Sequence, residues 1–214
     1  MSVSVSDLVV SIASPQDAAA MVEVIHSAFG ARPPLDPPSS AIDETAETLA
    51  ATLQQGTGVF ALVGDRPAGV IAVLPGADGV ATFSRVSVHP DLQRHGIASA
   101  MVTAAEELAA IRGFQRVELF TRAEFPEFLG FWQRRGFVVE RVVPHGVILT
   151  KPLPLVIKVP TSADMVRLGE RLARLLESGD VIIAGGDLGA GKTTLTQGIG
   201  RGLGSEGPII SPTF

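Results

Sequence analysis

Three prolines at positions 152, 154 and 160 constrain the fold more than any other feature, because they divide the chain into two parts. Proline lacks an amide hydrogen and fixes φ, so regular structure starts and stops around it. We therefore expect one domain at residues 1–152 and a second at residues 153–214. The length of 214 residues fits one domain of ~100–150 residues and a smaller one.

The composition excludes several classes of function. Zero cysteines exclude disulfides, thiolate metal sites and thiol nucleophiles. The formal net charge of −5 argues against a protein that coats nucleic acid, because phosphate neutralisation needs clustered Lys and Arg. The acidity belongs to residues 1–152, with 11 Lys/Arg against 16 Asp/Glu, whereas residues 153–214 carry 6 of each. Any contact with RNA should therefore be local or made by partner proteins.

The sequence shows no targeting or membrane segment. Its first residues, MSVSVSDLVVSIASP, lack the basic start and long apolar core of a secretory signal. No run approaches the ~18 consecutive apolar residues that a membrane-spanning helix needs. We therefore expect a cytoplasmic protein without membrane contact.

Residues 1–152 predict a mixed α/β layer arrangement. Runs of β-branched residues bounded by Gly, Pro and Asp predict strands, and apolar residues at helical spacing predict helices. The predicted strands cover residues 8–13, 58–63, 68–74, 80–88, 116–121, 137–143 and 146–150. The predicted helices cover residues 15–29, 42–53, 97–111 and 126–135. The proline-rich stretch 31–40 is interpreted as a connecting loop that borders a site, with a recognition peptide as the alternative.

The start of the third predicted helix has the features of an anion site. Residues 85–98 run from a strand through a turn into the helix, and Gly96 and Ala98 stand where a backbone approaches another group closely. The free amides and the dipole of a helix N-terminus favour an anion, and Arg94 adds a positive charge. These residues by themselves do not distinguish coenzyme A from another phosphate compound.

Two motifs in this domain resemble those of the GNAT (Gcn5-related N-acetyltransferase) superfamily. Residues 93–98, QRHGIA, resemble its Q/R-x-x-G-x-G/A motif, and residues 131–137, FWQRRGF, resemble its later F-Y-x-x-x-G-F stretch. The resemblance covers residues 6–152 and implies a GNAT-type mixed sheet flanked by helices. It also implies acetyl-CoA bound with its pyrophosphate on residues 94–99, and transfer of the acetyl group to an amine. The acetyl-CoA residues that it implies are Val86, Val88, Gln93, Arg94, His95, Gly96, Ile97, Ala98 and Ser99.

Acetyl transfer needs a base for the incoming ammonium and an acid for the departing thiolate. The acid of this family is commonly the Tyr of F-Y-x-x-x-G-F, but Trp132 stands there and the chain has no tyrosine. Glu118 is the candidate base, with a solvated or paired strand residue as the alternative. Aligned on the related ribosomal-protein acetyltransferases, the carboxylate position falls on Phe120 instead. The four histidines lack metal-ligand spacing, so no zinc site is predicted, and His89 is interpreted as a turn residue.

Residues 153–214 carry a nucleotide-binding signature. Thr161 caps a helix that ends before Gly179, residues 181–184 predict a buried strand, and a second helix follows over 194–203. Between them lies a G-x-x-x-x-G-K-[ST] loop, whose glycines let amides turn around a β-phosphate of ATP. Lys192 would reach the phosphate oxygens, and the Thr193 hydroxyl would ligate Mg²⁺. The predicted nucleotide-binding residues are Gly186, Asp187, Leu188, Gly189, Ala190, Gly191, Lys192, Thr193 and Thr194.

A wider pattern resembles the start of TsaE, the ATPase subunit of the bacterial machinery that makes threonylcarbamoyladenosine in tRNA. The pattern consists of Leu168-Gly169, residues 186–194, Arg201-Gly-Leu-Gly204 and Ser211-Pro-Thr-Phe214. Met165 departs from it, because the family usually has Thr there. The family's later part, with the acidic strand end that completes Mg²⁺ binding, is absent after Phe214. We therefore expect only the N-terminal part of this domain, without ATP hydrolysis of its own.

The leading interpretation is a bifunctional fusion of an acetyl-CoA-dependent N-acetyltransferase with a TsaE-type ATPase. Its implied partners are an amine acceptor of unknown identity and the other proteins of the threonylcarbamoyladenosine complex, with tRNA contacted only indirectly. The alternative is a non-catalytic acyl-CoA-binding or scaffolding module attached to the ATPase. A P-loop kinase for small molecules is disfavoured by residues 186–194 together with residues 211–214.

Overall fold

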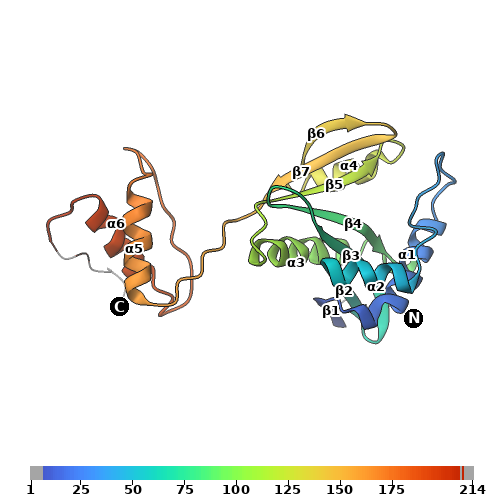
Figure 1. Cartoon of the computed structure of the whole chain (residues 1–214), viewed down its shortest axis with the longest axis horizontal. Helices are drawn as coiled ribbons and strands as arrows, with labels where there is room; N and C mark the ends of the chain where they lie inside the picture. Colours follow the sequence, from blue (N-terminus) through green and yellow to red (C-terminus); the bar gives the residue numbers. More distant parts are fainter. Residues whose placement is uncertain (1–6, 208, 210–214) are drawn as a thin grey trace. The chain divides into compact units, whose positions relative to one another are not determined.

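The computed structural model describes residues 7–207 and 209 and divides into two compact units between Val156 and Ile157 (Figure 1). The Ser211–Phe214 motif lies outside the described residues. Within the described part of the chain, no helix has the length and apolar character needed to cross a membrane.

The first unit is built on one seven-stranded sheet with strand order β1-β2-β3-β4-β5-β7-β6. Neighbouring strands are antiparallel except β4 and β5, which run parallel. The mixed α/β class predicted from the sequence is confirmed. The strands are β1 (Leu8–Ile12), β2 (Thr57–Val63), β3 (Arg66–Pro75), β4 (Val80–Val88), β5 (Arg116–Arg122), β6 (Val138–Val143) and β7 (Gly146–Pro152).

Helices pack on both faces of this sheet. One hydrophobic core joins α1 and α2 to sheet residues that include Phe60 and Val70. The other core joins α3 and α4 to residues that include Phe83 and Leu119. Full burial of such a side chain contributes roughly 1.5–3 kcal/mol, so the two cores hold the sheet firmly between the helix layers. The helices are η2 (Pro15–Asp17), α1 (Ala18–Gly30), α2 (Ala46–Gln55), η3 (Pro90–Leu92), α3 (Ile97–Ile111) and α4 (Pro126–Gln133).

Strands β4 and β5 separate halfway along their length. Their parallel pairing ends at Phe83 and Leu119. Immediately beyond, a β-bulge sets Arg85 and Val86 of β4 opposite the single residue Ile71 of β3. A bulge bends its strand and increases the local twist, and Figure 1 shows the two strands diverging. The β4 edge past Phe83 is therefore not paired with β5.

Most of the predicted elements form where the sequence places them. The helix predicted over 97–111 forms with those bounds. The second helix begins at Ala46 rather than at residue 42, because the hydroxyl of Thr45 accepts the amide of Thr48 at 3.2 Å and caps it. Ile42 therefore lies outside the helix and is exposed, contrary to the predicted apolar face.

The described residues of the second unit form the helices α5 (Ser162–Ala173) and α6 (Lys192–Gly202), whose backbones lie in close contact. A Cβ built at Gly169 would lie 2.5 Å from the carbonyl oxygen of Leu195. One built at Gly198 would lie 2.3 Å from the carbonyl oxygen of Val166. Only glycine permits this approach, so the two glycines fix how the helices cross.

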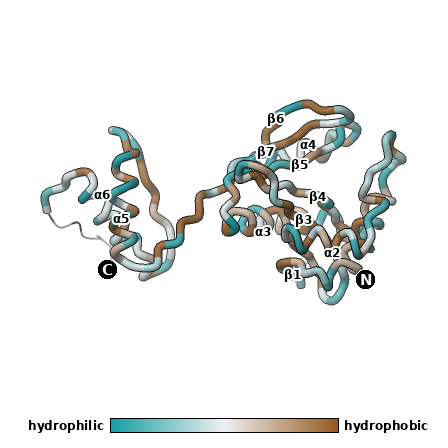
Figure 2. The backbone as a smooth tube through the Cα atoms, in the orientation of Figure 1, coloured by the Kyte–Doolittle hydropathy of each residue, from teal (hydrophilic) through white to brown (hydrophobic). Residues whose placement is uncertain are grey.

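The strand predicted over residues 181–184 does not form, and that prediction is wrong for this structure. Val181 is 86% exposed and Ile183 is 91% exposed. A strand needs ladder partners and a face to bury, and the described residues of this unit supply neither. The apolar stretch at 155–157, which appears brown between β7 and α5 in Figure 2, is also exposed.

Candidate functional site

The segment between β4 and α3 forms an open cradle at a helix N-terminus. Residues 93–96 are exposed, and both Arg94 (φ 64°) and Gly96 (φ 81°) adopt the left-handed conformation. Gly96 is the N-cap of α3, so the amides at 97–99 belong to the first turn, which lacks intrahelical acceptors. A Cβ built at Gly96 would have no heavy atom within 4 Å. The geometry leaves room for an anion in front of these amides.

Arg135 reaches the same helix end, and sequence reasoning missed it. Its guanidinium contacts the Ser99 hydroxyl, donates to the Phe131 carbonyl oxygen at 2.9 Å, and stacks on the Phe131 ring with 3.6 Å to the centroid. Burial, aided by the charge of Arg134, lowers the pKa of the Arg135 guanidinium. A cation at a helix N-terminus opposes the helix dipole, so this charge would be stabilised by an anion bound between them. The signal available in the sequence was the pair of arginines before Gly136.

The exposed edge of β4 adjoins the cradle. Val86 and Val88 lie beyond the point where β4 leaves β5, and their side chains are half-buried against the α3 core. The Gln93 side-chain amide donates to the Val88 carbonyl oxygen at 3.4 Å, which ties the start of the cradle to this edge. An extended chain could add to the edge by main-chain hydrogen bonds.

Glu118 lies on β5 in the part that is still paired with β4. Its carboxylate is within 3.2 Å of Arg116 and 3.5 Å of Arg141, and its side chain is 16% exposed. Phe120, two residues along the same strand, is 46% exposed. These ion pairs are what we expect if Glu118 is a paired strand residue, which is the alternative to its role as a base.

Trp132 is part of the hydrophobic core. It is 5% exposed, and its ring makes edge contacts with Phe131 and Phe137 at centroid distances of 5.1 and 5.0 Å. An indole N–H is not an acid at physiological pH, so this residue cannot replace the phenolic proton donor.

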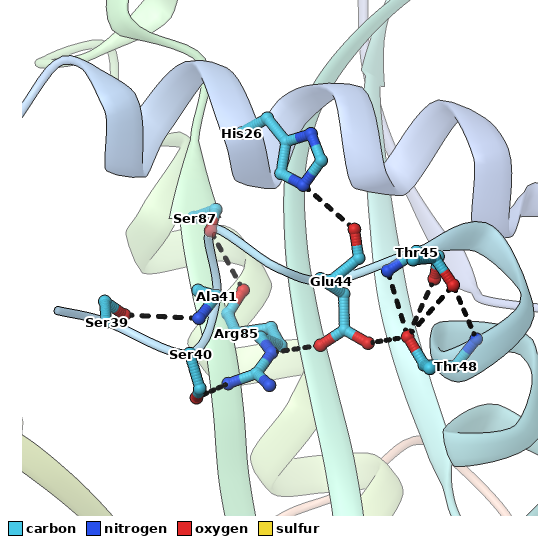
Figure 3. Close-up of polar contacts among 9 residues, drawn as sticks. All are labelled: His26, Ser39, Ser40, Ala41, Glu44, Thr45, Thr48, Arg85 and Ser87. Atoms are coloured by element: carbon cyan, nitrogen blue, oxygen red, sulfur yellow. Dashed lines mark hydrogen bonds and ion pairs between the residues drawn. The ribbon is translucent and has the colours of Figure 1, made fainter.

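A second polar cluster lies where the bulge of β4 meets the segment before α2, and it too was missed from the sequence (Figure 3). Glu44 is buried, and one of its carboxylate oxygens contacts Arg85 Nε. The other oxygen accepts the hydroxyl of Thr48 at 2.5 Å. Arg85 Nη1 also donates to Ser40 Oγ at 3.3 Å, and His26 Nε2 lies 2.9 Å from the Glu44 carbonyl oxygen. A carboxylate 41 residues from its partner leaves no local pattern by which to predict the pair.

Two cavities in the first unit are lined mostly by residues outside the cradle, and His89, at the start of the β4–α3 segment, lines the smaller one. The larger, of about 380 Å³, is lined by residues that include Arg112 and Phe114 at the carboxyl end of α3. At 1.5 Å per residue this end lies ~22 Å along the helix from its start. The smaller, of about 190 Å³, lies between α1 and the start of β3. Residues 93–96 line neither cavity and are exposed, so this part of the cradle lies on the surface.

In the second unit, the predicted phosphate loop precedes α6. Gly186, Gly189 and Gly191 all have positive φ, with Gly191 as the N-cap of α6. Lys192 Nζ donates to the carbonyl oxygens of Gly186 and Asp187 at 2.7 and 2.8 Å. The lysine thus closes its own loop, and a nucleotide phosphate would compete for its charge.

Two family models match the chain. The acetyltransferase (GNAT) family matches residues 21–137, and the family of the threonylcarbamoyl adenosine biosynthesis protein TsaE matches residues 159–214.

Curated relatives match the second of these regions. The chain is 60% identical over 50 residues to the tRNA threonylcarbamoyladenosine biosynthesis protein TsaE of Streptomyces coelicolor, and 61% identical over 46 residues to that of Synechocystis. These matches cover 23% and 22% of this chain, and 34% and 29% of the relatives. The chain thus spans about a third of the length of the curated relatives that it matches.

Solved structures resemble the first unit. The PaiA N-acetyltransferase from Thermoplasma acidophilum, in complex with coenzyme A, has a TM-score of 0.60 and 18% identity, covering 68% of this chain and 98% of its own. The ribosomal-protein-S18-alanine N-acetyltransferase from Escherichia coli has a TM-score of 0.56 and 17% identity, covering 72% and 99%. At these identities the likeness shows the fold alone.

Proposed function

The chain belongs to the acetyltransferase (GNAT) family and continues into a TsaE segment, and from this premise we propose that its first domain transfers an acetyl group from acetyl-CoA to an amine. The observation that carries the proposal is the open cradle at Gly96 beside the free edge of β4. One feature suits an anion and the other suits an extended chain, and coenzyme A contains both a pyrophosphate and an extended pantetheine arm.

We assign the two parts of acetyl-CoA to this surface as follows. The amides of residues 94–99 would hold the pyrophosphate, and Arg94 and Arg135 would supply positive charge around it. The β4 edge at Val86 and Val88 would pair with the pantetheine. Gln93, His95, Ile97, Ala98 and Ser99 complete the cradle. When bound, acetyl-CoA supplies an activated acetyl group, which passes from sulfur to the amine nitrogen while the thiolate takes up a proton.

For proton transfer, the site offers a candidate base but no candidate acid among the residues considered. Glu118 is the proposed base for the ammonium of the acceptor, and its carboxylate forms ion pairs with Arg116 and Arg141. Trp132 cannot donate a proton to the thiolate, so we expect slow transfer. A non-catalytic acyl-CoA-binding module remains the second candidate function, and the burial of Trp132 in the core favours it.

For the second domain we propose nucleotide-phosphate binding in the service of tRNA threonylcarbamoyladenosine formation. The support is the match to the TsaE family and the left-handed glycines around Lys192. Residues 186–194 would wrap the phosphates of ATP, and the Thr193 hydroxyl would ligate Mg²⁺. The proposed partners are other proteins of that machinery, with tRNA contacted through them.

Calorimetry with coenzyme A tests the first proposal, and release of free thiol from acetyl-CoA against a panel of amines tests transfer. Binding with turnover supports the acetyltransferase, and binding without turnover supports the scaffolding module. A chain that does not bind coenzyme A contradicts both. For the second domain, binding of ATP that is lost in Lys192→Ala supports the assignment, whereas equal binding by both proteins contradicts it.

A further inference from the structure

The bulge in β4 is held in a conformation that its sequence does not favour. Arg85 has φ of 53°, in the left-handed region where residues with a Cβ are uncommon. It is one of the two β4 residues that face Ile71, immediately past the last β4–β5 pair. Such outliers persist only where surrounding contacts hold them, and they gather at functional sites.

The contact that holds Arg85 is its ion pair with Glu44. The Glu44 side chain is 6% exposed and that of Arg85 is 27% exposed. Separating the pair would leave a buried carboxylate with only the hydroxyl of Thr48, which is strongly unfavourable. The remaining contact of the guanidinium, with Ser40, comes from the same segment between α1 and α2. The ion pair therefore ties this segment to the bulge.

A second arginine ties the same segment to β5. Arg122, at the end of β5, donates to the carbonyl oxygens of Asp36 and Pro37 at 3.2 Å each. Arg32 anchors the segment further, because its guanidinium stacks on the rings of Phe29 and Phe128 at 3.9 and 4.9 Å. The segment at 31–45 thus bridges the parts of β4 and β5 that lie beyond their last pair, with one arginine reaching it from each strand.

We infer that Glu44 is a positioning residue, which acts through Arg85 to hold the β4 bulge and so fixes the strand edge against which the acyl thioester lies. The inference rests on the proposed acetyl-CoA site and adds a residue to it. The segment at 31–45 also lies beside the point where the strands separate. The same ion pair would therefore set the position of the amine-binding side of the site relative to the side that binds acetyl-CoA.

The test compares Glu44→Gln with the matched control Glu47→Gln, which makes the same substitution on the exposed first turn of α2. Glutamine keeps one acceptor oxygen, so either Arg85 or Thr48 faces a side-chain NH2 group instead of an acceptor, and the negative charge is lost. Three quantities are measured on the full chain: coenzyme A affinity, the carbonyl stretch of bound ¹³C-labelled acetyl-CoA, and turnover with the amine panel. The carbonyl stretch reports the hydrogen bonds that the thioester receives, and it does not depend on which amine is the acceptor.

We expect Glu44→Gln to bind coenzyme A with an affinity close to that of the wild type, because the cradle at 93–99 makes no contact with Glu44. Turnover should fall by ~10²-fold, the scale of a small misplacement of reacting groups, and the carbonyl stretch should move toward its value in water. Glu47→Gln should match the wild type in all three. A Glu44→Gln protein with wild-type stretch and turnover overturns the inference alone. A wild-type chain that does not bind coenzyme A overturns the proposed function, and the inference with it.

A second variant separates positioning through the backbone from a loss of folding. Glycine adopts positive φ freely, so Glu44→Gln combined with Arg85→Gly keeps the bulge accessible without the ion pair. Glu44→Gln combined with Arg85→Ala also removes the ion pair, but alanine has a Cβ and is strained at the positive φ of the bulge. The glycine combination should recover part of the carbonyl shift relative to the alanine combination. Equal spectra for the two combinations would show that Arg85 does not act through its backbone and would overturn the inference.

Discussion

The two glycines that bound α3 permit a controlled test of the cradle. Gly96 has φ of 81° and precedes the helix, and Gly113 has φ of 88° and follows it. A Cβ built at either position would have no heavy atom within 4 Å. Gly96→Ala and Gly113→Ala therefore impose the same backbone strain, at opposite ends of one helix, without a steric clash in the unliganded protein.

The effect on stability follows from that strain. A residue with a Cβ in the left-handed region costs about 1–2 kcal/mol, and the lower entropy of the unfolded chain offsets about 0.4–1 kcal/mol of this. A net loss of about 1 kcal/mol should lower the melting temperature by roughly 2–4 °C for a chain of this size. Both variants should show the same small shift, measured by circular dichroism.

The effect on coenzyme A should differ between the two variants. At Gly96 the added methyl group would enter open space at the N-terminus of α3, where the phosphate is proposed to bind, so affinity should fall by at least ~10-fold, or about 1.4 kcal/mol. At Gly113 the methyl group lies at the far end of the helix, and affinity should stay at the wild-type value. Calorimetry at matched temperature measures both. Equal affinities for the two variants would refute the placement of the phosphate at Gly96.

Three further predictions concern two carboxylates and the segment at residues 181–184. If Glu118 is the base, Glu118→Gln should lower acetyl transfer by ~10²–10⁴-fold, and an unchanged rate would eliminate it. The hydrogen bond from Arg66 lowers the pKa of the Asp91 carboxyl, so its contribution to stability is present above the usual ~3.9 and is lost as the pH falls through the lower folded value. An NMR titration should show that low pKa, and it should return to the usual range in Arg66→Ala. Amide hydrogen exchange should be fast at 181–184 and slow in β3, and slow exchange at 181–184 would show a strand that we do not observe.

The helix at 97–111 was predictable because every level of the sequence agrees on it. Its apolar residues recur at helical spacing, and glycines able to adopt positive φ stand at both ends. The conformation of residues 181–184 was not predictable in this way, because an apolar run forms a strand only when neighbouring strands complete the sheet. The helix start at Ala46 was misplaced by four residues, since Ile42 fits the apolar period but the Thr45 cap decides the boundary.

In the candidate site too, features that are local in the sequence were predictable, and contacts between distant elements were not. The helix start at Gly96 is a local feature, so the glycine and the apolar period after it were enough to predict where α3 begins. Arg135 and the Glu44–Arg85 pair belong to the surroundings of that site, and they depend on how separate elements pack. A sequence carries no periodic signal for a contact between residues 44 and 85, because neither a helix nor a hairpin relates them.

The second unit shows why phosphate binding and hydrolysis should be treated as separate properties. Gly169 and Gly198 let α5 and α6 meet at backbone contact, and this contact does not involve residues 181–184. The helix that follows the phosphate loop therefore forms, with Gly191 as its N-cap, although the strand before the loop does not. Amides of a helix N-terminus and one lysine are sufficient to attract a phosphate. Hydrolysis additionally requires a water and a metal ion held in fixed geometry, so it is a separate property from phosphate binding.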